Sequence, residues 1–167
     1  VWVVDPNKLG PHIKVAKHPS VGATEVVLDR AATGSKGSVG NIFDVHTGAK
    51  LELTGLTLTG GNYQTGTGGI YVSRLGILLV NNCTFTGFIA GSGGVLGFDR
   101  GVVAVFKNSI FRDNVATQGG VLCLMSPAGT DAYKVYNGPI THIVFERCTF
   151  SNNRATDGAV VMITDYG

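Results

Sequence analysis

Charge is scarce in this sequence of 167 residues: only 14% of the residues are Asp, Glu, Lys or Arg, and the formal net charge is +2. No basic cluster accompanies this small positive balance, so the composition does not indicate a nucleic-acid partner. Long apolar runs are missing too, and none approaches the roughly 20 residues that a membrane-spanning helix needs. No signal peptide is visible, although the chain begins with Val1 and not with Met, so the compartment is not directly readable.

Cysteine is also rare, and the three cysteines are an odd number that gives no disulfide framework. Cys83 and Cys148 occupy the same place in two similar segments, and Ser109 holds that place in a third segment between them. If these segments are stacked strands about 4.8 Å apart, roughly 10 Å separates the two sulfurs. That distance exceeds the reach of a disulfide. We therefore predict that both cysteines are small buried apolar residues.

Glycine, by contrast, is abundant, with 25 residues, and many of the glycines belong to a repeated segment. The stretch 111–122 recurs at 150–161 almost residue for residue, and 85–96 is a looser copy. An earlier copy starts at Leu58, so the starting positions 58, 85, 111 and 150 differ by 27, 26 and 39 residues. A period near 26, broken once by an insertion, indicates a repeat architecture.

Each repeat contains two short stretches of alternating apolar residues, separated by a two-residue break. In the second repeat Leu78 and Val80 alternate, Asn81-Asn82 intervenes, and Cys83 and Phe85 resume the pattern. Alternation with a period of two is typical of β-strands with one buried face. Two inward-facing columns are therefore predicted: Leu58, Phe85, Phe111 and Phe150 in one, and Leu53, Val80, Phe106 and Phe145 in the other.

A third strand is expected in each repeat after the glycines, where the chain must turn tightly before it re-enters a sheet. The residues predicted to face inward there are Phe43 and Val45, Ile70 and Val72, Val95 and Gly97, Val121 and Cys123, and Val160 and Met162.

Three short strands per 26 residues or so, without helical periodicity, predict an all-β fold: a right-handed parallel β-helix with roughly four regular rungs. A β-sandwich is the alternative, but it would not explain columns that keep their residue type from repeat to repeat. Residues 1–40 are predicted to form an irregular N-terminal cap or first turn, and 41–167 the β-helix repeats. The 13 extra residues of the last spacing (39 minus 26) predict a loop insertion at 126–139, in which Tyr133 and Tyr136 are candidate contact residues.

A polysaccharide lyase or hydrolase would need clustered acidic or basic side chains on neighbouring repeats. Aligning the repeats tests for such a cluster. The alignment places Asp113 with Gly87 and Asn152, Asp157 with Gln118 and Ser92, Asp99 with Arg74, and Asp44 with Tyr71, Leu96 and Leu122.

No carboxylate in this alignment has another carboxylate above or below it, so no catalytic residue is predicted. Asp99-Arg100 beside Arg74 comes nearest to a polar site and is more simply a surface ion pair. The four histidines fall at unrelated positions, and no Asp-rich calcium repeat occurs, so neither a metal nor a cofactor is predicted. We expect that the protein is not an enzyme.

Two outward-facing features remain. Thr57-Leu58-Thr59 and Thr84-Phe85-Thr86 place threonines in register, as an ice-binding or carbohydrate-binding face might, although threonine is simply a good strand residue. Asn82-Cys83-Thr84 is an N-glycosylation sequon at a predicted turn, where Asn82 should face solvent.

The Gly-Gly-Ile-Tyr and Gly-Gly-Val-Leu segments at 68–71, 93–96 and 119–122, paired with Phe-Arg-Asp-Asn at 111–114 and Phe-Ser-Asn-Asn at 150–153, resemble the repeats of polymorphic outer-membrane proteins. Those proteins are surface-exposed adhesins with a right-handed β-helix passenger, and similar repeats occur in large extracellular proteins of algae and other protists. The resemblance covers about residues 40–165. It implies a β-helix at the cell surface or in the extracellular matrix, and it supplies no catalytic residues.

Two functional hypotheses follow. The first is a non-enzymatic extracellular structural or adhesive module, a segment of a larger surface protein or filament. Its partners would be other subunits, or further domains of the same chain, stacked on the solenoid ends. The second is a polysaccharide-binding or polysaccharide-degrading β-helix similar to pectate lyase, with carbohydrate as the partner.

Overall fold

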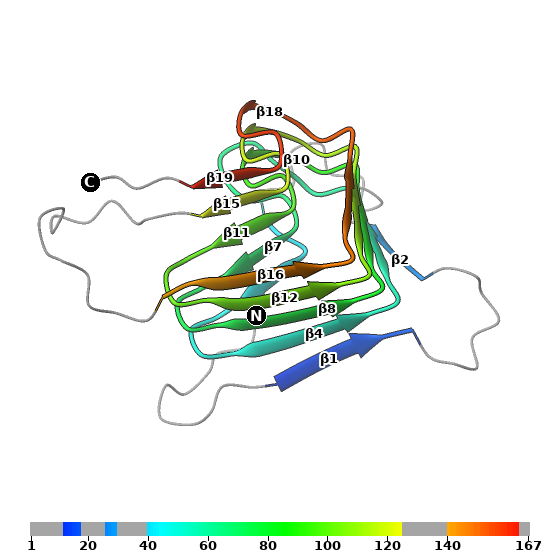
Figure 1. Ribbon diagram of the computed structural model, residues 1–167, viewed down its shortest axis with the longest axis vertical. Helices are drawn as coiled ribbons and strands as arrows, with labels where there is room; N and C mark the ends of the chain where they lie inside the picture. The colour runs from blue at the N-terminus through cyan, green and yellow to red at the C-terminus, as the bar shows by residue number, and fades with distance from the viewer. Residues whose placement is uncertain (1–11, 18–25, 30–39, 125–139, 164–167) are drawn as a thin grey trace, which may run out of the picture.

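The computed structural model describes residues 12–17, 26–29, 40–124 and 140–163. Within these ranges the chain forms 19 β-strands and no helix. The strands pair in parallel and belong to four sheets, which face one another around a common interior (Figure 1). The all-β class is therefore confirmed for the part of the chain that the structure describes.

We name the sheets A to D and give their strands in chain order. Sheet A contains β1 (His12–Ala16), β4 (Lys50–Thr54), β8 (Ile77–Asn81), β12 (Val103–Lys107) and β16 (His142–Glu146). Sheet B contains β2 (Val27–Asp29), β5 (Thr57–Thr59), β9 (Thr84–Thr86), β13 (Ile110–Arg112) and β17 (Thr149–Ser151). Sheet C contains β3 (Phe43–Val45), β7 (Ile70–Val72), β11 (Leu96–Phe98), β15 (Leu122–Leu124) and β19 (Val161–Ile163). Sheet D contains β6 (Asn62–Tyr63), β10 (Ile89–Ser92), β14 (Val115–Gln118) and β18 (Arg154–Asp157).

The chain visits the sheets in the constant order A, B, D, C. We call β4–β7 repeat 1, β8–β11 repeat 2, β12–β15 repeat 3 and β16–β19 repeat 4. Each repeat adds one strand to every sheet, whereas the sequence predicted three strands per repeat. The strands of sheet D were missed. Their inward-facing residues in repeats 2 to 4 are Ala90, Ala116 and Ala155, which are too small to give a clear hydrophobic alternation.

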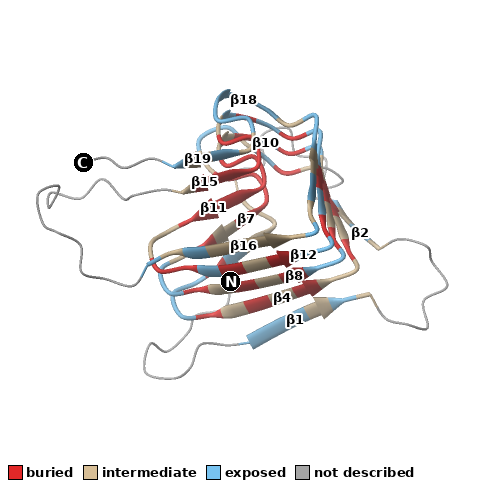
Figure 2. Ribbon diagram, in the orientation of Figure 1, coloured by how far each residue is buried: buried red, intermediate tan, exposed pale blue. Residues whose placement is uncertain are grey.

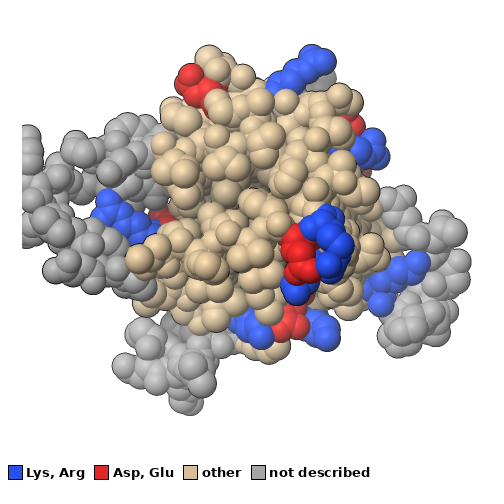
Figure 3. Space-filling view, in the orientation of Figure 1, with Lys and Arg blue, Asp and Glu red and all other residues tan. Residues whose placement is uncertain are grey.

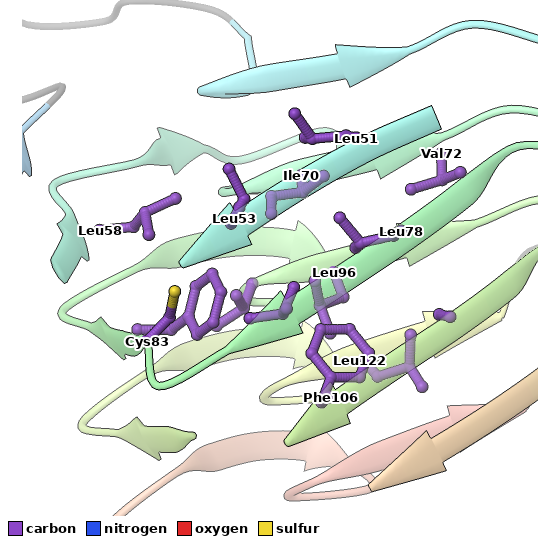
Figure 4. Packing of buried hydrophobic residues seen from close by; sticks show 14 of the residues in the cluster. Leu51, Leu53, Leu58, Ile70, Val72, Leu78, Cys83, Leu96, Phe106 and Leu122 are labelled. Atoms are coloured by element: carbon purple, nitrogen blue, oxygen red, sulfur yellow. The ribbon is translucent and has the colours of Figure 1, made fainter. Parts of the chain in front are cut away.

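The core consists of columns of apolar side chains that run across the repeats (Figure 4). Buried residues recur at similar places in successive strands (Figure 2). Both predicted columns are confirmed by the strand register: Phe111 pairs with Phe85 and Phe150, and Phe106 pairs with Val80 and Phe145. The rings of Phe85 and Phe111 are stacked with centroids 4.9 Å apart and an interplanar angle of 5°. The column of Phe106 meets that of Phe111 edge to face, with centroids 5.6 Å apart. Both centroid distances lie within the range of favourable aromatic pairs, and the T-shaped contact is one that aromatic quadrupoles favour.

The predicted register of the third strand was wrong by one residue in repeats 2 to 4. Ile70 pairs with Leu96 and not with Val95, because Val95 stands beside Gly69 in the stack. The glycine pairs of repeats 1 and 2 are therefore not equivalent, although they were aligned with each other. The strand residues that face inward after the glycines are Leu96 and Phe98, Leu122 and Leu124, and Val161 and Ile163. Val95 and Val121, which were predicted to face inward, precede these strands and are nevertheless fully buried in the core.

The four corners between the sheets are built by residues with positive φ, which recur at equivalent places. Glycine suits such places because it has no Cβ to clash. At Gly119 (φ 61°) an added Cβ would lie only 2.1 Å from the carbonyl oxygen of Leu122. In sequence order, the corner columns are Gly48, Leu75 and Gly101; Gly55, Asn82, Asn108 and Arg147; Gly60, Gly87, Asp113 and Asn152; and Gly93, Gly119 and Gly158.

Candidate functional site

An asparagine ladder lies inside the corner between sheets B and D. Asn114 is fully buried, and its Oδ1 accepts the backbone N–H of Phe88 at 3.1 Å. Its Nδ2 donates to the carbonyl oxygen of Phe85 at 3.2 Å and to Asn153 Oδ1 at 2.9 Å. Asn153 repeats the pattern one repeat later, where its Nδ2 donates to Phe111 O at 2.9 Å. These amides connect repeats 2, 3 and 4 to one another.

Polar side chains on the outer surface also make contacts from one repeat to the next. Lys107 Nζ lies 2.9 Å from Glu146 Oε2 in the next repeat. Asn108 Nδ2 donates to Asn81 Oδ1 at 3.0 Å, and Arg147 Nε donates to Asn108 Oδ1 at 2.8 Å. The hydrogen bond from Lys107 and the charge of Arg147 lower the pKa of the Glu146 carboxyl. These surface groups also connect successive repeats.

An open depression of about 340 Å³ lies on the outside, where sheets B and D meet in repeats 3 and 4. Asp113, Val115, Asn152 and Arg154 line it. Asp113 accepts a hydrogen bond from Asn152 at 3.2 Å and forms an ion pair with Arg112 at 3.1 Å. The predicted stacking of Asp113 on Asn152 is therefore confirmed. The alignment did not single out Arg154, which pairs with Val115 in sheet D.

A second polar group surrounds Tyr71 on the outer face of sheet C. The side chain of Tyr71 hydrogen-bonds with Asp99, and Asp44 is the residue that pairs with Tyr71 in the neighbouring strand. Burial raises the pKa of the Tyr71 hydroxyl, and the negative charges of Asp99 and Asp44 raise it further. The predicted alignment of Asp44 with Leu96 was wrong, because Tyr71 pairs with Gly97. For the same reason Asp99, which follows Phe98, lies level with Ser73 and not with Arg74, since Phe98 pairs with Val72.

The outer faces of sheets A and B differ in polarity. On sheet B, Thr57 pairs with Thr84, and Thr59 with Thr86, so the threonines form the predicted array. Ile110 and Arg112 interrupt the array in repeat 3. On sheet A, the outward positions of β8, β12 and β16 are mostly apolar, and Figure 3 shows a cluster of charged side chains to the right of the centre of this face. The apolar residues are Ile77, Leu79, Val103, Val105 and Val144.

The sequon residue Asn82 is exposed at the corner between sheets A and B, as predicted. Its φ of 53° is left-handed, and its backbone N–H donates to Lys107 O at 3.0 Å. Thr84, the third residue of the sequon, lies in β9 and is half-buried. The predicted contact residues Tyr133 and Tyr136 lie outside the described residues, as does the 126–139 insertion.

The three cysteines carry free thiols. Cys83 and Cys123 are buried, and burial raises the pKa of both thiols. Cys148 is partly buried, and its Sγ lies 3.5 Å from the carbonyl oxygens of Phe106 and Glu146. The structure thus agrees with the predicted free thiols and with the burial of Cys83.

Among the described residues, no group of three or more His, Cys, Asp or Glu side chains is arranged to hold a metal ion. No helix in that part of the chain is long and apolar enough to cross a membrane. Neither a protein-family model, nor a curated protein, nor a solved structure matches the chain.

Proposed function

We propose that the protein is a non-enzymatic structural or adhesive module of an extracellular or cell-surface protein, built as a right-handed parallel β-helix of about 26 residues per turn. The constant order of the four sheets and the parallel pairing of equivalent strands support the β-helix. Right-handed coiling is the rule for parallel strands that are joined by crossover connections.

The observation that best supports a structural role is that polar side chains bond from one repeat to the next. Asn114, Asn108 and Lys107 each bond to a side chain in the next repeat. Buried hydrogen bonds of this kind stabilise the stack, because a buried amide without partners costs about 1–3 kcal/mol. These three polar side chains thus join one repeat to the next.

Exposure of the Asn82 sequon supports an extracellular setting. The expected result is one glycan when the chain is directed through a eukaryotic secretory pathway, seen as a mobility shift that an N-glycosidase reverses. Asn82→Gln and Thr84→Ala should abolish the shift, while Thr84→Ser preserves it. An unshifted wild-type chain would remove this support.

A second candidate function is binding or cleavage of an acidic polysaccharide, and the depression on repeats 3 and 4 favours it. Asp113 offers a carboxylate there, and Arg154 offers a guanidinium that suits a uronate carboxylate. A polysaccharide-cleaving site, however, requires an acid and a base placed on either side of the scissile bond. Asp113 is the one carboxylate among the residues that line this depression.

Depolymerisation assays on polygalacturonate and alginate separate the two candidates. The structural role predicts no turnover above a buffer control and no change with Asp113→Asn or Arg154→Gln. Turnover that either substitution abolished, with the circular dichroism spectrum unchanged, would establish the enzymatic alternative and reject the proposal.

A further inference from the structure

The four sheets end together at repeat 4. Strands β16, β17, β18 and β19 are the last strands of their sheets in the described part of the chain. Each therefore presents one row of backbone N–H and C=O groups that no described strand pairs. At the opposite margin, β1, β2 and β3 are the first strands of sheets A, B and C. Such edges are templates for pairing with another chain.

The apolar core reaches the margin at repeat 4, where no strand among the described residues covers it. Phe106 and Phe111 in repeat 3 have no exposure, whereas Phe145 and Phe150, their neighbours in repeat 4, are only partly buried. Val161 and Ile163 on β19 are 40% and 68% exposed. Figure 2 shows the same change: β12 and β15 contain buried residues, whereas β16 and β19 contain only intermediate and exposed ones.

The two margins carry matching side chains, because each is the end of the same columns. The column that ends at Phe145 begins at Val15 on β1, and the column that ends at Phe150 begins at Leu28 on β2. In sheet C, the column that ends at Val161 begins at Phe43 on β3, and the column that ends at Ile163 begins at Val45. A translated copy would thus continue each column with an apolar residue.

We propose that β16, β17 and β19 of one copy pair with β1, β2 and β3 of a second copy, head to tail and in the register of the existing sheets. This rests on the β-helix of the proposed function and names its partner. In that register Ala16 of the second copy lies next to Glu146, and Lys14 lies diagonally opposite on the same outer face, which gives a favourable charge pair. A contact between two different margins does not close on itself, so it produces a filament.

Single lysines at the two margins test the proposal. Ile13 faces inward on β1 and is 40% exposed, so Ile13→Lys should block that margin with little effect on folding. Ile163→Lys should block the other margin in the same way. Ile110 is 41% exposed but faces outward in repeat 3, so Ile110→Lys is a matched control.

Sedimentation velocity over a concentration series, with circular dichroism on each sample, gives the readout. Wild type and Ile110→Lys should form assemblies that grow with concentration, and each margin variant should be monomeric. An equimolar mixture of the two margin variants should form a dimer, about twofold the monomer mass, because one intact margin of each kind remains.

A wild-type monomer at every concentration, with its β spectrum intact, would overturn head-to-tail stacking and leave the proposed β-helix standing. Self-association of Ile13→Lys or Ile163→Lys alone would overturn it in favour of a contact between like margins. Loss of the β spectrum in the wild type would overturn both this proposal and the proposed function.

Discussion

At the scale of single residues, Asn114 shows how this interior accommodates a polar side chain. The residue is fully buried, yet its Oδ1 accepts one hydrogen bond and its Nδ2 donates two. In repeat 2 the equivalent residue is Phe88, whose backbone N–H is the donor to Asn114 Oδ1. The ladder therefore begins at Asn114 and continues to Asn153.

Replacing Asn114 by alanine should lower the free energy of unfolding by about 1–3 kcal/mol, because the Phe88 N–H would stay buried without its hydrogen-bond acceptor. Urea unfolding followed by circular dichroism measures the change. Asn81→Ala is the control: Asn81 is exposed, and its loss should stay within about 0.5 kcal/mol. Equal effects at the two positions would mean that the ladder contributes nothing specific.

At the scale of elements, the aromatic columns stabilise the interior through stacked rings. Phe111 stacks between Phe85 and Phe150, at centroid distances of 4.9 and 5.1 Å. Phe111→Ala should therefore cost about 3–5 kcal/mol, the usual range for truncating a buried phenylalanine. Phe111→Leu should cost less, since Leu58 holds the same place in repeat 1. Urea midpoints report both, and a loss under about 1 kcal/mol for the alanine variant would contradict the burial.

Substituting two corner glycines with similar φ distinguishes the cost of backbone strain from the cost of steric crowding. Gly48 has φ of 70° and nothing within 4 Å of an added Cβ, while at Gly119 that atom would lie 2.1 Å from Leu122 O. Gly48→Ala should cost about 1–2 kcal/mol, from left-handed backbone alone. Gly119→Ala should cost about 1–3 kcal/mol more, because the corner must also move. Thermal unfolding of the pair checks the difference, and equal losses would show that the corner relaxes freely.

The same elements show how far sequence reasoning reaches. The columns of Phe111 and Phe106 were predicted correctly, because large apolar residues recur there at nearly constant spacing. The strand after the glycines was misaligned because the sequence aligns Gly68-Gly69 with Gly93-Gly94. In the structure the two glycine pairs are offset by one residue, so that Ile70 pairs with Leu96 and not with Val95. Neither the hydrogen bond between Tyr71 and Asp99 nor the depression beside Arg154 could be predicted. Both features depend on the direction of side chains and on the exact strand register. The repeat pattern alone determines that register only to within one residue.

At the scale of the whole molecule, each described strand contacts mainly the strands before and after it in its own sheet, as expected for the stack of the proposed β-helix. The stability of such a stack is approximately a sum of repeat terms and nearest-neighbour terms. Repeat 3 has a neighbour on both sides, whereas repeat 4 has a described neighbour on one side only. Unfolding is therefore expected to begin at repeat 4.

Hydrogen exchange measured by mass spectrometry tests this gradient. On the Ile163→Lys variant, whose margin is blocked, peptides from β16 and β17 should exchange at least about tenfold faster than those from β12 and β13, because terminal units open before the centre does. In the wild type at high concentration, stacking should slow exchange in β16, β17 and β1 together and leave β12 unchanged. Equal protection of repeats 3 and 4 in the variant would show that the stack opens as one unit, with the nearest-neighbour terms dominant. Repeat 4, at the margin, would then open no more readily than repeat 3, inside the stack.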